Sequence, residues 1–86
     1  MGGQAEYELI EGDDGGTTLA LSGPYLVSTI AAVDEDIRAI DVSLSQIDLS
    51  GVSEIDTVGA WVVKRISRDH EADIVGESDR ARRLIS

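Results

Sequence analysis

The side chains best suited to chemistry in this chain lie between positions 48 and 57. Asp48, Asp56 and Thr57 place two carboxylates and a hydroxyl within ten residues. A close carboxylate pair can act as general acid and base, but Asp also favours helix N-caps, so we expect Asp48 to end a strand and Asp56 to cap a helix. A hydroxyl on the first helical turn lies beside unpaired N–H groups and the positive end of the dipole. Thr57 is therefore a candidate phosphorylation site.

Other catalytic groups are scarce. The single histidine, His70, falls near the end of a predicted helix, where a capping or solvated side chain is the simpler interpretation, since a catalytic histidine needs a positioned partner. The chain has no cysteine, and it lacks a glycine-rich loop ending in Gly-Lys-Ser or Gly-Lys-Thr. We expect no catalytic residues, no metal and no cofactor, and therefore an interaction domain rather than an enzyme.

Composition narrows the class of partner. The 86 residues are 42% hydrophobic and lack Phe, which predicts one domain with a small aliphatic core. Seventeen acids against seven bases give a net charge of -10, which disfavours nucleic acid and anionic membrane surfaces. No apolar run approaches the roughly 20 residues of a membrane span, and the acidic start does not resemble a secretory signal. We expect a cytoplasmic protein.

The first half of the chain predicts a hairpin followed by a helix. Residues 7–11 and 17–22 are predicted strands, joined by the glycine-rich turn at 12–16. Gly23-Pro24 is expected to end the second strand. Apolar residues then recur at helical spacing from Leu26 to Ile40, which predicts an amphipathic helix.

The second half continues the alternation. A strand is predicted from Val42 to about Asp48, followed by a small polar turn and a helix that begins at Thr57 and runs to about His70. A short strand at 72–76 and a last helix at 77–86 complete the order β-β-α-β-α-β-α. This order predicts a single α/β domain over residues 1–86, a four-stranded mixed sheet with its helices on one face.

A helical wheel divides the helix at Thr57 into two faces. The core side is predicted to hold Val58, Gly59, Val62, Val63 and Ile66. The polar side is predicted to hold Thr57, Trp61, Lys64 and Arg68. Trp61, the largest apolar side chain, thus projects from the polar side, where it either forms an interface or packs on a neighbouring loop or helix.

The basic residues are concentrated in the same half of the chain. Six of the seven follow position 63: Lys64, Arg65, Arg68, Arg80, Arg82 and Arg83. This pattern is typical of solvated helix faces, where basic residues near the C-terminus interact favourably with the helix dipole. It is also compatible with a basic strip that orients a charged partner.

The segment from Asp48 to Gly59 reads D-L-S-G-V-x-x-I-D-T-x-G and resembles the STAS domain. STAS domains occur in anti-sigma factor antagonists and in transporters, and the predicted strand order is also theirs, so the resemblance covers essentially the whole chain. In antagonists, the hydroxyl residue that follows the Asp is phosphorylated by a partner kinase. The resemblance therefore implies the same role for Thr57.

The form D-T-x-G-A-W is more similar to the STAS domain of MlaE-type lipid ABC transporters, where it contacts the ATPase subunit. The favoured interpretation is a regulatory subunit, or the N-terminal domain of a permease, at the cytoplasmic face of the inner membrane. It would bind the ATPase through Ser53, Asp56, Thr57, Trp61, Lys64 and Arg68. The alternative is an anti-sigma factor antagonist switched by phosphorylation at Thr57. A small-ligand carrier with a pocket between sheet and helix is a third possibility.

Overall fold

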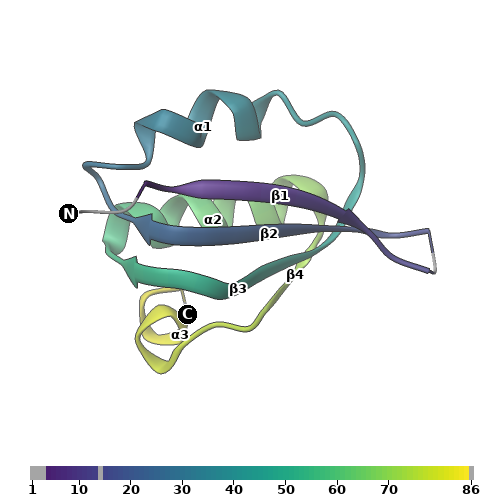
Figure 1. Cartoon of the computed structure of the whole chain (residues 1–86). Helices are drawn as coiled ribbons and strands as arrows, with labels where there is room; N and C mark the ends of the chain where they lie inside the picture. The colour runs from purple at the N-terminus through teal and green to yellow at the C-terminus, as the bar shows by residue number, and fades with distance from the viewer. Residues whose placement is uncertain (1–3, 14, 86) are drawn as a thin grey trace.

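One mixed sheet organises the described part of the chain, residues 4–13 and 15–85, in the computed structural model (Figure 1). Its four strands are β1 (Glu6–Glu11), β2 (Thr17–Tyr25), β3 (Leu44–Ile55) and β4 (Asp73–Val75). They lie in the order β1-β2-β3-β4, with β1 antiparallel to β2 and the other neighbours parallel. The prediction of a four-stranded mixed sheet is confirmed.

Helices cover one face of this sheet. They are α1 (Ala31–Arg38), α2 (Thr57–His70) and α3 (Asp79–Ile85). In Figure 1, α2 passes behind the strands, with α1 at the top and α3 at the bottom. The alternation along β2 and β3 explains the arrangement, since every second residue is buried beneath the helices: Leu19, Leu21, Ile47 and Leu49. The predicted order β-β-α-β-α-β-α is confirmed.

The end of β2 differs from the prediction. Gly23-Pro24 does not end the strand, because β2 continues through an irregularity at these residues and pairs Tyr25 with Ile55 of β3. Gly23 makes this possible through a positive φ of 78° and a close approach to the carbonyl of Gln4. Tyr25 becomes fully buried, and its hydroxyl donates a hydrogen bond to the carbonyl of Glu6. Burial raises the pKa of Tyr25 well above its ordinary range.

Two further boundaries were also wrong. The segment after Asp48 is not a polar turn but the second half of β3, which runs to Ile55 and is held by parallel pairing with β2. The predicted helix from Leu26 is shorter, because the Thr29 hydroxyl donates to the carbonyl of Pro24 and accepts from the N–H of Leu26. This side-chain bonding stabilises a turn before α1, as Ser and Thr often do.

Candidate docking surface at the start of helix α2

Asp56 joins two parts of the chain at the start of α2. It has an extended backbone, and one carboxylate oxygen accepts the N–H of Gly59 at 2.9 Å, so the predicted N-cap is confirmed. The other oxygen accepts the N–H of Val27, also at 2.9 Å. The hydrogen bonds from Gly59 and Val27 hold the pKa of Asp56 below its ordinary value. One carboxylate therefore caps α2 and fixes the segment that leads into α1.

This double role predicts a pH-dependent contribution to stability. Because the folded pKa of Asp56 is lowered, its charge stabilises the fold above the unfolded pKa of about 3.9, and the effect is lost as pH falls through the folded value. We expect Asp56→Asn to lower the free energy of unfolding by about 0.5–1.5 kcal/mol at neutral pH. In urea denaturation the deficit should shrink below about pH 4. The exposed Asp36→Asn is the control, and a deficit that stays constant with pH would contradict the assignment.

Gly59 lets α2 begin directly against the end of β2. A Cβ atom at this position would lie 2.0 Å from the carbonyl oxygen of Tyr25 and 3.2 Å from a side-chain carbon of Ile55. Such a contact is far inside van der Waals distance, so a larger residue would force the helix away from the strand. The glycine of the D-T-x-G pattern is therefore a packing requirement, and it sets the position of the residues just before it.

Thr57 is the first residue of α2 and is exposed to solvent. Its hydroxyl is thus accessible to a modifying enzyme. The neighbouring N–H groups are not all free to receive a phosphate, because Asp56 already accepts one of them. A phosphate on Thr57 would add about -1.5 to -2 charge next to this carboxylate. A phosphate at this position would therefore disturb the start of α2 rather than be stabilised by it.

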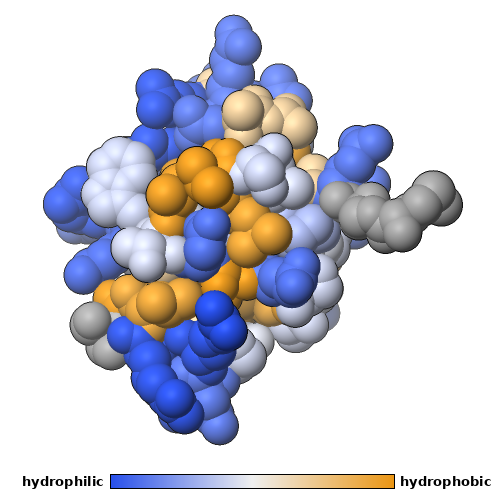
Figure 2. Space-filling model, turned by 90° about the vertical axis from the view of Figure 1, so that its left-hand side faces the viewer, coloured by the Kyte–Doolittle hydropathy of each residue, from blue (hydrophilic) through white to orange (hydrophobic). Residues whose placement is uncertain are grey.

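Three apolar side chains around Thr57 are exposed. The exposed fractions are 65% for Val27, 57% for Trp61 and 38% for Val58. Val27 lies beside the helix start because its N–H is bound by Asp56. Figure 2 views this end of the molecule and shows apolar atoms gathered near its centre with polar residues around them. We call Val27, Thr57, Val58 and Trp61 the α2 docking surface.

The placement of Val58 corrects the helical wheel, which assigned it to the core side. Val62, Val63 and Ile66 are buried as predicted, and so is Gly59. The buried stripe extends toward Ala60 instead of Val58, because Ala60 is only 2% exposed. Val58 therefore lies at the margin of the stripe and adds apolar area to the surface beside Thr57.

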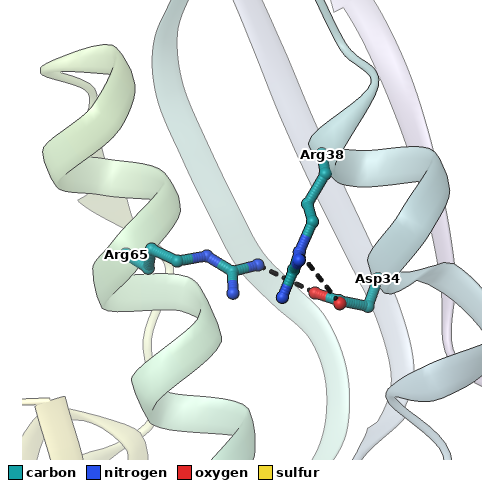
Figure 3. A network of polar contacts seen from close by, with 3 residues as sticks. All are labelled: Asp34, Arg38 and Arg65. Carbon is teal, nitrogen blue, oxygen red and sulfur yellow. Dashed lines mark hydrogen bonds and ion pairs between the residues drawn. The ribbon is translucent and has the colours of Figure 1, made fainter.

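An ion-pair network connects the Trp61 ring to helix α1 through Arg65. The guanidinium carbon of Arg65 lies 5.1 Å from the centre of the Trp61 ring, within cation–π distance. Arg65 itself donates to Asp34 of α1 at 2.8 Å, and Arg38 pairs with the other oxygen of Asp34 at 3.1 Å (Figure 3). The guanidinium that contacts the ring thus belongs to the same helix, and the ring stays largely exposed. This arrangement favours the interface interpretation of Trp61 over packing on a neighbouring loop.

The remaining predicted site residues are spread along α2 and around its start. Ser53 and Asp56 line a pocket of about 200 Å³ that also includes Leu26 and Arg80. Lys64 and Arg68 are exposed, but Arg68 follows Thr57 by eleven residues and so lies about 16 Å along the helix. Ser53, Asp56, Thr57 and Trp61 therefore lie around the start of α2, whereas Arg68 lies farther along the helix.

The residues considered for acid–base catalysis or metal binding do not lie close to one another. Asp48 accepts the N–H of Ser50, and Asp56 follows it by eight positions along an extended strand, a span of roughly 25 Å. The two carboxylates therefore do not form a pair. Among the described residues, no group of three or more His, Cys, Asp or Glu side chains is arranged to hold a metal ion. None of the helices formed by these residues has the length and hydrophobicity that a bilayer crossing requires.

The element order, the sheet topology and the capped start of α2 define a STAS-type fold, as the sequence predicted. The structure is similar to the crystal structure of an anti-sigma-factor antagonist STAS domain from Rhodobacter sphaeroides, with a TM-score of 0.64. The match covers 85% of this chain and 87% of that chain, at 18% sequence identity, and it establishes the fold. No protein-family model matches the sequence, and no curated protein matches it significantly.

Proposed function

We propose that this chain is a non-catalytic interaction domain that works as an anti-sigma factor antagonist does, binding a regulatory protein and being switched by phosphorylation at Thr57. The observation that carries the proposal is an exposed threonine on the first turn of α2, surrounded by the exposed side chains of Val27, Val58 and Trp61. Exposed aromatic and aliphatic groups that surround a modifiable hydroxyl are suited to a phosphate-sensitive interface. The similarity in fold to an antagonist supports this choice.

The switch would act through charge next to Asp56. In the unmodified chain, this carboxylate holds both Gly59 and Val27. A phosphate on Thr57 repels the carboxylate and competes for the same helix N-terminus. Either effect weakens the hydrogen bond between the N–H of Val27 and the carboxylate of Asp56. The phosphate itself places negative charge in the middle of an apolar surface. A partner that buries Val27 and Trp61 would therefore bind the unmodified form and release the phosphorylated form.

The proposal predicts one site of phosphorylation. Incubation of the chain with a cognate anti-sigma kinase and ATP should add a single phosphate, which peptide mass spectrometry should locate on Thr57. Thr57→Ala should abolish the modification, whereas Thr29→Ala is the matched control, because the Thr29 hydroxyl is bound in a turn. Phosphate on another residue, or none at all, would count against the switch.

A second candidate is a STAS subunit or domain of a lipid ABC transporter that binds the ATPase at the cytoplasmic face of the inner membrane. The specific observation in its favour is the exposure of Trp61 within the D-T-x-G-A-W segment. In that case the α2 docking surface would bind the ATPase without modification of Thr57. Copurification with an ATPase and permease, rather than with a kinase, would distinguish this candidate from the first.

A further inference from the structure

Charge is separated between the sheet and the helices. None of the four strands in the described chain contains a Lys, Arg or His residue. All seven Lys and Arg residues of the protein lie in helices α1, α2 and α3. The strand acids Glu6, Glu8 and Asp48 belong to the face of the sheet that points away from α2, which in Figure 1 is the front of the sheet. The strands therefore supply carboxylates and no basic side chain to this uncovered face.

The strand register places two of these acids on either side of a small residue. Glu8 of β1 pairs with Ala20 of β2, and Ala20 pairs with Asp48 of β3. Neighbouring strands lie about 4.8 Å apart, so the backbones of Glu8 and Asp48 are roughly 9.6 Å apart across Ala20. A hollow of about 540 Å³ lies here, and its lining also includes Ser22, Ser50 and Gly51. The lining thus combines small side chains with the acids Glu6, Glu8 and Asp48, and one carboxylate oxygen of Asp48 accepts the N–H of Ser50 at 2.9 Å.

Among residues 4–13 and 15–85, these carboxylates form no ion pair with a Lys, Arg or His side chain. The ion pairs of the described residues join Asp34 to Arg38 and Arg65, and Glu77 to Arg82. Glu6, Glu8 and Asp48 take part in none of them. Like charges that converge on an uncovered surface attract a group of opposite sign and orient it during encounter.

We propose that this sheet face is a second docking site and that it binds a basic segment of a partner protein, with a Lys or Arg side chain lying over Ala20 between Glu8 and Asp48. A long basic side chain can rest its methylene groups on the alanine and extend its charged end to a carboxylate. A second copy of this chain is disfavoured by the net charge of -10. The site lies on the opposite side of the sheet from α2 and does not depend on the proposed function.

The test is a titration of the isotope-labelled chain, followed by NMR, with a peptide that alternates arginine and serine. We expect saturable amide shifts centred on Glu8, Ala20 and Asp48. The double substitution Glu8→Gln, Asp48→Asn should weaken binding at least about tenfold. The double substitution Glu35→Gln, Asp36→Asn removes the same charge from exposed positions on α1 and should change binding by less than about twofold, because solvent screens distant charges.

A third variant checks the position of the bound group. Ala20→Arg supplies a basic side chain from the sheet itself and should abolish peptide binding. The midpoint of thermal unfolding should not change. Equal weakening by the two double substitutions, shifts centred on the helices, or unchanged binding to Ala20→Arg would each overturn the proposal. Saturable shifts with calcium chloride but not with the peptide would assign the hollow to a cation and would also overturn it.

Discussion

Gly59→Ala should destabilise the domain by at least about 3 kcal/mol, although the same change in an ordinary helix stabilises by about 1 kcal/mol. The reversal of sign comes from the 2.0 Å that would separate the new Cβ from the carbonyl oxygen of Tyr25. A backbone atom cannot move aside as the end of a flexible side chain does, so the helix must shift. In a domain of this size such a loss corresponds to a fall in thermal midpoint of about 12 °C or more.

A second glycine provides the control for this measurement. Gly15 has a positive φ of 85° but open space around it, so Gly15→Ala tests backbone conformation without a clash. We expect it to cost about 1 kcal/mol. Thermal unfolding followed by circular dichroism would measure both variants. A midpoint for Gly59→Ala that equals or exceeds that of the unmodified chain would show that α2 does not need this close approach.

Trp61→Ala should weaken partner binding by at least about 2 kcal/mol, or roughly thirtyfold, with little effect on folding. The ring is 57% exposed, so the folded chain loses little when it is removed, whereas a partner that covers it loses a large buried area. Isothermal titration with the cognate kinase would measure the effect for the first proposed function. The same titration with the transporter ATPase would measure it for the second.

The matched control is an exposed apolar residue far from the helix start. Val42 is 43% exposed and lies just before β3, so Val42→Ala removes exposed apolar area without touching the α2 docking surface. It should leave the affinity within about twofold of the unmodified chain, because isolated surface contacts contribute little. Equal effects of Trp61→Ala and Val42→Ala would indicate that the partner does not use this surface.

The parts of the fold that depend on neighbours in sequence could be predicted. Asp56 before an amphipathic run is a local signal for an N-cap, and it located the start of α2 correctly. The wheel also placed Trp61 outside the core, because a helix of fourteen residues has a well-defined periodicity. The alternation of strands and helices likewise determined the order of elements.

The parts that depend on distant partners could not be predicted. Gly23-Pro24 ends most strands, but here parallel pairing with β3 carries the strand to Tyr25. The exposure of Val27 depends on its hydrogen bond to Asp56, twenty-nine residues away. The exposure of Val58 depends on which side of α2 packs on the sheet. Only the structure shows that this side includes Ala60 rather than Val58.

The contact between Arg65 and Trp61 also has a consequence for the cost of association. The carboxylate of Asp34 fixes the guanidinium, and the guanidinium in turn restricts the indole ring, so the ring loses rotamer freedom when the domain folds. A partner then meets a side chain that is already oriented, and less conformational entropy is lost on binding. An acid on α1 that touches no partner would in this way help to set the affinity of a surface on α2.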